Sequence, residues 1–364
     1  MASADDARAA REAKLDELQE RLTAAVEQLV TGEDWAQALA FAARFRSRSF
    51  NNTLLIFAQH EAAYLEGRVS EPLPTFVAGY RQWEQLGRHV DRGQKAYAIL
   101  SPVLGRFAST TPQDPGSWRR LDPREQPRRG EVVRSALVGV RPASVFDVSQ
   151  TSGAELPIPP SPVLLEGEAP SGLREGLIEQ VEACGFEFVP VPHEGMIRGA
   201  NGLTDYTAHR VAVRENMDPA AQVKTLAHEL AHVRMHDPRD EDTTQHRGIA
   251  EVEAESVALM IGAAHGMDTN AYTVPYVSNW ATTVDRKDPV AVVQATAERV
   301  RKTTVSILDG LQTVQVGDGA PPGLARSVQA QRPKRLDACR PSAPAAAPER
   351  RPSRSSAPAF DRGR

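Results

Sequence analysis

The sequence contains very little cysteine and no long apolar segment. Cys184 and Cys339 are the two cysteines among 364 residues, which is too few for a disulfide-based scaffold, and neither lies in a C-x-x-C pair that would predict a thiolate zinc site. An apolar run of about 18 residues is missing, which argues against a membrane-spanning helix. The first residues, MASADDARAAREAK, lack the apolar core of a signal peptide. Together these absences predict a cytoplasmic protein with no membrane partner.

Charge is distributed unevenly along the chain, although the formal net charge is −4. Residues 44–150 contain 16 lysines and arginines against 10 acidic residues, whereas residues 151–320 contain 13 against 25. A basic segment next to an acidic one indicates two modules with different partners, and the basic one is suited to a polyanion such as nucleic acid. A merely solvated surface would give the same counts.

Hydrophobic periodicity predicts an α+β protein with two domains, each a mixture of helices and strands. Helical spacing extends over residues 5–30 and again from Asp34, a potential N-cap, to Phe45. Short strands and turns follow, interrupted by a Pro-, Gly- and Arg-rich segment that we interpret as a solvent-exposed insertion. The predicted boundaries are 1–157 for the first domain with its insertion at 109–130, 158–172 for a proline-rich linker, 173–315 for the second domain, and 316–364 for a disordered basic tail.

The segment LAHELAHVRMH contains the most informative motif. His228, Glu229 and His232 form H-E-x-x-H on a predicted helix that Asp218 caps and Pro219 opens. Histidines four residues apart project from one helix face, so both can bind a single Zn²⁺. The glutamate beside the first histidine can take a proton from a water molecule that zinc has acidified. The motif therefore predicts a hydrolytic zinc site. The alternative is an exposed helix with two chance histidines.

A catalytic zinc site needs a third protein ligand in addition to the two histidines. A histidine six residues after the second one is absent, because that position is Pro238. The next predicted helix, GIAEVEAESVALMIGAAHG, offers Glu251 and Glu255 on one face and Glu253 about 200° away from Glu251. His246, in the segment between the two helices, is the competing ligand.

HELAH followed by E-x-E-A-E-x-x-A resembles the ImmA/IrrE-type zinc peptidases, a gluzincin-like group. The resemblance implies a metallopeptidase domain in which Glu251 is the third zinc ligand and Glu255 orients a ligand histidine. Many members have asparagine at the position of Glu255, so this chain departs from one family pattern and matches another. His236 is expected to interact with the end of its own helix rather than with the metal.

The basic segment carries a second resemblance. WAQALAFAARFRSRSFNNTLLIFAQ, TFVAGYRQWEQLGRHVDRGQKAYAILSPV and VFDVSQTSGAELP resemble the amino-terminal, single-stranded-DNA-binding domain of ArdC-type antirestriction proteins. In that family the domain precedes a zinc metallopeptidase-like domain, so the resemblance implies a single-stranded DNA partner and a relation to mobile elements. The match covers residues 44–106 and 137–157.

A protein that binds single strands needs cations along the phosphate backbone and aromatic faces for the bases. Trp83 has core packing as an alternative role, and the Asn51–Asn52 pair has helix capping. The candidate DNA-binding residues are Arg46, Arg48, Asn51, Asn52, Arg81, Trp83, Arg88 and Lys95.

Three functions are compatible with the sequence. The chain is a single-stranded-DNA-binding protein with a zinc-dependent peptidase that uses Glu229 as base and cleaves an unidentified protein. Alternatively, it is a protective DNA-binding protein whose zinc domain is structural or inactive, or a DNA-responsive protease that cleaves a repressor. A purely structural site would not need Glu229, which favours the enzyme.

Overall fold

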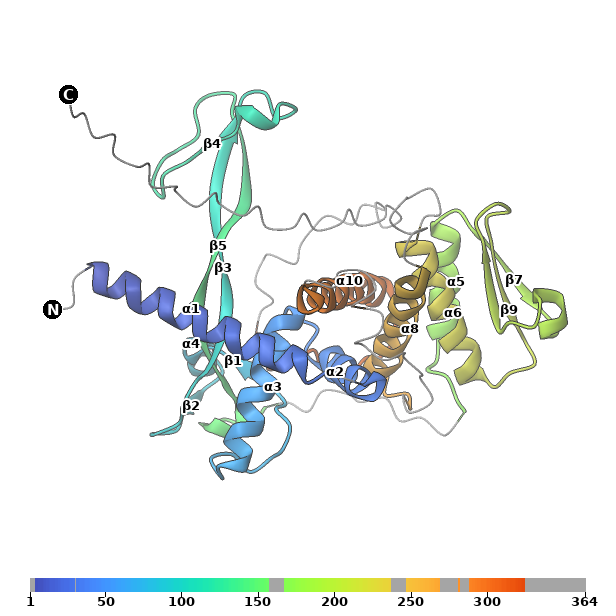
Figure 1. Cartoon of the computed structure of the whole chain (residues 1–364), viewed down its shortest axis with the longest axis horizontal. Coiled ribbons are helices and arrows are strands. Elements are labelled where there is room, and N and C mark those ends of the chain that lie inside the picture. The colour runs from blue at the N-terminus through green and yellow to red at the C-terminus, as the bar shows by residue number, and fades with distance from the viewer. Residues whose placement is uncertain are drawn as a thin grey trace, which may run out of the picture.

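The computed structural model describes residues 4–29, 31–156, 167–236, 247–268, 281 and 288–324. Figure 1 shows a helical body, a small sheet at one side of it, and a long two-stranded ribbon that extends away from the helices. Helices and strands occur in both halves of the chain, which confirms the predicted α+β class. His246 and most of the expected 158–172 linker lie outside the described residues. Within the described residues, no helix combines the length and apolarity needed to cross a membrane.

Four of the helices formed by the described residues belong to the amino-terminal half. Thr31 caps the second of them, and Asp34 completes a capping box by accepting from the Thr31 backbone at 2.8 Å. The expectation that Asp34 is the N-cap was therefore wrong by three residues, because this aspartate serves as the reciprocal partner of the cap. The helices are α1 (Ala4–Glu27), α2 (Gly32–Arg44), α3 (Phe50–Leu65) and α4 (Tyr80–Gln85).

The strands of this half form a four-stranded sheet in the order β1-β5-β3-β4 and a β2-β6 pair. The segment 109–130, expected to be an exposed insertion, forms the ordered tip of the β3–β5 ribbon, because β4 pairs antiparallel with the end of β3. The strands are β1 (Val77–Ala78), β2 (Arg88–Val90), β3 (Tyr97–Ser109), β4 (Arg119–Arg120), β5 (Val132–Asp147) and β6 (Thr151–Gly153), with 3₁₀ turns at Pro115–Ser117 and Val148–Gln150.

In the carboxy-terminal half, the described residues form a three-stranded sheet beside four helices. The sheet order is β7-β9-β8, with β9 parallel to β7 and antiparallel to β8. The central strand therefore lies within the segment HRVAVREN, and β8 is an edge strand. The elements are α5 (Leu173–Ala183), β7 (Glu187–Val191), a 3₁₀ turn at Glu194–Ile197, β8 (Gly202–Asp205), β9 (Arg210–Arg214), α6 (Pro219–Met235), α8 (Arg247–Ala264) and α10 (Pro289–Gly310).

The two halves share a hydrophobic core. One continuous cluster of buried side chains includes Leu39 of α2 and Leu55 of α3 together with Leu230 of α6 and Leu259 of α8. Within this cluster the indole Nε1 of Trp35, on α2, donates to Ser256 Oγ on α8 at 2.9 Å, and both residues are completely buried. The two segments are therefore packed as one body and not as separate modules joined by a linker.

The segment after α10 returns to the amino-terminal half. Arg46 donates to the backbone carbonyls of Val316 and Gly317 at 2.9 and 3.1 Å, and Val77 N donates to Gly319 O at 2.9 Å. These bonds hold residues that we had expected at the start of a disordered tail. Residues 325–364, the rest of the expected tail, lie outside the described part of the chain.

Candidate metal centre

Helix α6 presents the H-E-x-x-H motif as the sequence predicts. Asp218 caps it, since its side chain accepts from Ala221 N at 2.8 Å, and Pro219 occupies the first turn. Val223, Leu226 and Leu230 are buried against the core. Their burial turns the opposite helix face, with His228 and His232, toward α8.

Three side chains of α6 and α8 converge on one point. The Nε2 atoms of His228 and His232 are 3.0 Å apart, and the Glu251 oxygens lie 3.5 Å from the first and 3.7 Å from the second. A tetrahedral Zn²⁺ with bonds of about 2.0–2.1 Å requires ligand atoms roughly 3.3 Å apart. The spacing and the chemistry of two imidazoles and one carboxylate therefore fit a divalent cation. The same three residues emerge as a potential metal-binding group from the geometry of the described residues.

Glu229 is positioned by the edge strand β8. Its carboxylate is buried and accepts from Thr204 Oγ1 at 2.6 Å. Gly202, on the same strand, leaves no room for a side chain, because a Cβ there would lie 2.6 Å from Glu229 Oε1 and from Thr225 Cγ2. Strand and helix thus hold the carboxylate in a defined place next to the two histidines, as a general base requires.

The charges of the site perturb one another strongly. Burial alone would lower the pKa of His228, but hydrogen bonds to Glu251 and Glu255 outweigh it and raise that pKa to about 9. Hydrogen bonds from His228 and His232 lower the pKa of Glu251 well below its usual range. The two carboxylates thus stabilise the protonated imidazole of His228. A cation could bind His228 Nε2 only by displacing the proton from that nitrogen.

Each histidine ligand is also held through its second ring nitrogen. Glu255 Oε2 lies 3.3 Å from His228 Nδ1, while its other oxygen lies 2.9 Å from Lys224 Nζ. This contact is the one that the orienting role expected of Glu255 would require, and the Nε2 atom of His228 faces His232 Nε2 and Glu251 Oε2.

A buried chain of polar groups supports His232. His236 Nδ1 lies 2.9 Å from His232 Nδ1, His236 Nε2 lies 3.0 Å from Glu253 Oε2, and Arg299 donates to the other Glu253 oxygen. His236 and Glu253 are almost fully buried, and burial lowers the pKa of His236 despite the adjacent carboxylate. The helical spacing placed Glu253 on the side of α8 away from Glu251, but it did not predict this series of hydrogen bonds between His232, His236, Glu253 and Arg299. It also missed Thr204, because nothing in the sequence shows that β8 passes beside Glu229.

Three of the arginines expected to contact DNA are engaged within the protein. Arg46 binds the segment after α10, as described above. Arg48 donates to Val77 O at 2.7 Å, and burial lowers the pKa of its guanidinium. Arg88 donates to Thr151 Oγ1 and O at 2.9 and 2.7 Å. These bonds assign structural roles to all three side chains.

The remaining DNA candidates divide into buried and exposed residues. Trp83 is 0% exposed and its Nε1 donates to Phe146 O, so it is a core residue and no base can stack on it. Asn52 is buried and its amide bonds both to N and to O of Leu100. Asn51 is half-buried, whereas Arg81 and Lys95 are exposed.

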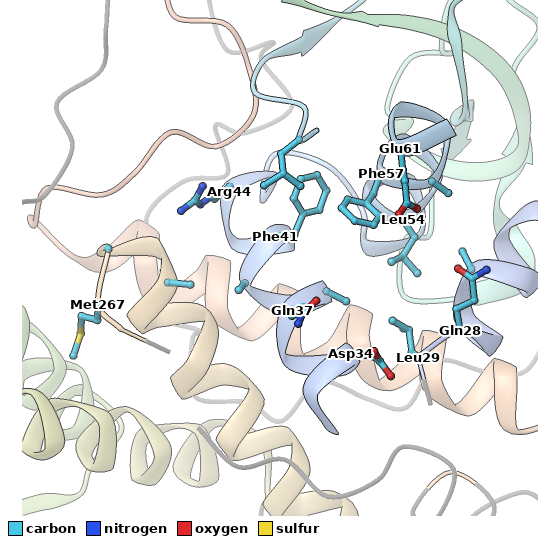
Figure 2. A pocket seen from close by; sticks show the side chains of 17 residues that line it. Gln28, Leu29, Asp34, Gln37, Phe41, Arg44, Leu54, Phe57, Glu61 and Met267 are labelled. Atoms are coloured by element: carbon cyan, nitrogen blue, oxygen red, sulfur yellow. The ribbon is translucent and has the colours of Figure 1, made fainter. Parts of the chain in front are cut away.

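A cavity of about 590 Å³ lies apart from the metal ligands, between α1, α2, α3 and the end of α8. Figure 2 shows Phe41 and Phe57 facing each other on one wall, with ring centroids 5.0 Å apart. Asp34 and Glu61 also line it. None of the three metal-converging residues takes part in this cavity, so it belongs to the junction of the two halves and not to the metal centre.

Comparison with known proteins agrees with both halves of this description. Residues 9–146 match the N-terminal domain of anti-restriction factor ArdC, and residues 195–274 match the IrrE N-terminal-like domain of the M78 peptidases. A curated relative, the uncharacterised protein pXO2-81 of Bacillus anthracis, is 24% identical over 265 residues, which is 68% of this chain and 43% of the relative. The chain thus spans less than half the length of that relative.

Two crystal structures of the antirestriction protein ArdC from the R388 plasmid are similar to this chain. The metal-free structure is 17% identical, covering 72% of this chain and 85% of that one with a TM-score of 0.39. The Mn(II)-bound structure is 15% identical, covering 71% and 88% with a TM-score of 0.38. The two domain matches confirm both resemblances that the sequence predicted. Along this chain, a segment that matches the ArdC amino-terminal domain thus precedes a segment that matches an IrrE-like metallopeptidase domain.

Proposed function

We propose that this protein binds single-stranded DNA through its amino-terminal half and hydrolyses a protein substrate at a metal centre in its carboxy-terminal half. The observation that carries the enzymatic part is the convergence of His228, His232 and Glu251 beside the buried carboxylate of Glu229. A structural metal site would need the three ligands but not a carboxylate held by Thr204 and given space by Gly202. We expect such a protein to act in the cytoplasm on incoming mobile-element DNA.

The residues of this site have separate tasks. A divalent ion held by the two histidines and Glu251 would polarise a scissile carbonyl and acidify water. Glu229 accepts a proton from the attacking water and can return it to the leaving amine. Thr204 holds that carboxylate in one orientation. Edge strand β8 offers unpaired backbone groups to an extended peptide, which brings a scissile bond alongside Glu229.

Zinc is the ion we propose, because two imidazoles and one carboxylate with an open fourth position are typical of catalytic zinc. Manganese is the alternative that the experiment must distinguish, since carboxylate and imidazole ligands also accept it. The DNA-responsive form of the proposal has one observation in its favour. The Trp35–Ser256 bond joins the ArdC domain directly to the helix that carries Glu251.

The test compares the wild-type chain with Glu229→Gln and Glu251→Gln. Metal content by mass spectrometry, Zn²⁺ and Mn²⁺ affinity by calorimetry, and cleavage of labelled casein with and without an oligothymidylate are measured for all three. We expect Glu229→Gln to retain metal and lose cleavage by at least a hundredfold, and Glu251→Gln to lose both. A wild-type chain that binds neither ion would refute the metal centre, and cleavage unaffected by Glu229→Gln would refute the assigned base.

A further inference from the structure

The β3–β5 ribbon is the feature of the molecule that the metal centre and the shared core leave unexplained. Strand β3 pairs with β5 over its whole length, and Figure 1 shows the two strands leaving the helical body with β4 at the far end. Most side chains between residues 132 and 141 are exposed. A ribbon of this length packs too little of its own surface to be a stability element, which indicates a role in binding.

Positive charge on the ribbon is poorly neutralised. Residues 97–147 contain eight arginines and no lysine, against five acidic residues. Glu125 and Glu131, the glutamates of the tip, both pair with Arg119. Six other arginines are exposed and, among the described residues, have no ion-pair partner: Arg120, Arg124, Arg128, Arg129, Arg134 and Arg141.

Strand register gathers guanidinium and aromatic groups on one face. Phe107 pairs directly with Arg120 on one side and with Arg134 on the other, so the three side chains form a row across β4, β3 and β5. The Arg134 guanidinium lies 4.0 Å from the centre of the Trp118 ring, whose indole N–H has no acceptor in the part of the chain that the structure describes. Arg141, paired with Ser101, continues the same face toward the body. We call these residues the arginine face: Phe107, Trp118, Arg120, Arg134 and Arg141.

We propose that the arginine face binds single-stranded nucleic acid, with phosphates on the guanidinium groups and unpaired bases stacked on the Phe107, Trp118 and Arg134 planes. This inference rests on the proposed function and names the surface that performs it. Arginine suits both tasks, because its planar guanidinium pairs with phosphate and also stacks on bases. Base stacking requires bases free of a duplex, which selects single strands. The opposite face carries exposed Leu104, Leu137 and Val140 and lacks this arrangement.

The test uses the full chain and a fluorescein-labelled oligothymidylate of about 20 nucleotides, which exceeds common site sizes of roughly 4–16. The ribbon variant changes Arg120, Arg134 and Arg141 to Ala. A matched control removes three positive charges of the carboxy-terminal half: Arg174, Arg210 and Lys302 to Ala. A second ribbon variant changes the same three ribbon arginines to Lys, so charge is kept while stacking is lost. Affinity is measured by anisotropy over a salt series.

We expect the ribbon-to-Ala variant to lose at least tenfold in affinity and to lower the salt slope by about 2, since each contact contributes roughly 0.7. The Lys variant should keep the salt slope but bind several-fold more weakly, and Trp118→Phe should abolish the DNA-dependent change in tryptophan fluorescence. The control should bind nearly like wild type.

The outcomes separate the inference from the proposed function. If wild type binds no oligothymidylate, the proposed DNA binding itself fails. If wild type binds but the ribbon-to-Ala variant matches the control, the arginine face is refuted while DNA binding stands. Tighter binding to a duplex than to a single strand would overturn the choice of ligand. Concentration-dependent dimerisation that the ribbon variants abolish, without any DNA effect, would identify the ribbon as a contact between copies instead. Circular dichroism checks that every variant is folded.

Discussion

The bond between Trp35 and Ser256 gives a quantitative test of whether the two halves of the chain fold as one unit. Trp35→Phe removes the indole donor and part of a completely buried side chain, and it leaves the buried Ser256 hydroxyl without that donor. Truncating buried aromatic residues to alanine costs about 3–5 kcal/mol, and an unsatisfied buried group costs about 1–3 kcal/mol. Because phenylalanine still fills most of the site, we expect the free energy of unfolding to fall by about 2–4 kcal/mol.

Ser256→Ala supplies the second arm of a double-mutant cycle. It removes the acceptor for the indole, so we expect a loss of about 1–3 kcal/mol by itself. In the double variant neither partner is left unpaired, and the loss should be smaller than the sum of the single losses by about 1 kcal/mol. Urea denaturation of the four proteins, followed by circular dichroism with and without Zn²⁺, measures both the coupling and the number of transitions.

The cycle has a clear refuting result. If the halves were independent modules, urea would give two transitions, and Zn²⁺ at about 100 times its dissociation constant would stabilise only one of them by about 2.7 kcal/mol. Additivity within about 0.3–0.5 kcal/mol would likewise show that the bond does not couple α2 to α8. Hydrogen exchange locates the effect, because metal should then protect slow amides of α2 as well as those of α6.

Three further predictions concern individual side chains. Glu253→Ala should lower the free energy of unfolding by about 2–4 kcal/mol and weaken metal binding roughly tenfold, because Arg299 and His236 lose a buried partner. Denaturation measures the first effect and calorimetry the second. An unchanged metal affinity would contradict a role of Glu253 in orienting His232 through His236. Gly202→Ala should reduce cleavage at least tenfold and stability by about 1–3 kcal/mol, because the new methyl group would displace Glu229; a fully active variant would contradict this. Burial raises the pKa of the Tyr97 phenol well above 10. The free energy of unfolding should therefore decline as pH rises above about 10, where the phenol ionises in the unfolded chain. Tyr97→Phe should remove part of that decline, as measured by urea titrations at alkaline pH.

Local signals made the metal centre predictable. The i and i+4 spacing of His228 and His232, the Asp218 cap and the apolar stripe of α6 are properties of a single helix, and the structure reproduces all of them. Helical spacing alone also separated Glu251 from Glu253. The preference for Glu251 over His246 as the expected third ligand rested on the family resemblance, because residues on different helices meet only through tertiary packing, and His246 lies outside the described residues.

The surface that we propose for DNA binding was harder to predict for a physical reason. Composition shows that arginines and aromatic residues are present, but it does not show which of them satisfy the protein's own carbonyl groups. Arg46 and Arg88 donate hydrogen bonds to backbone carbonyl oxygens, and Trp83 is buried in the core. The arginines of the 109–130 segment, by contrast, were interpreted as part of an exposed insertion. The sequence does not show the register in which β4 pairs with β3, so it did not predict that these arginines lie on an ordered ribbon.

The shared core has a consequence for how the two proposed activities would relate. Helix α8 places Glu251 and Glu255 beside His228 and Glu253 beside His236, and it contacts α2 of the ArdC domain through Ser256 on the same segment. A metal that fixes the first turns of α8 therefore also restricts the packing of α2, and any rearrangement of α2 or α3 on binding DNA must act on α8. Coupling of this kind is reciprocal, so a factor by which metal raises DNA affinity is the factor by which DNA raises metal affinity. An independent tethered peptidase would have a factor of one. Packing across a common core gives a physical route to a different value, and this is the feature that a DNA-responsive hydrolase would require.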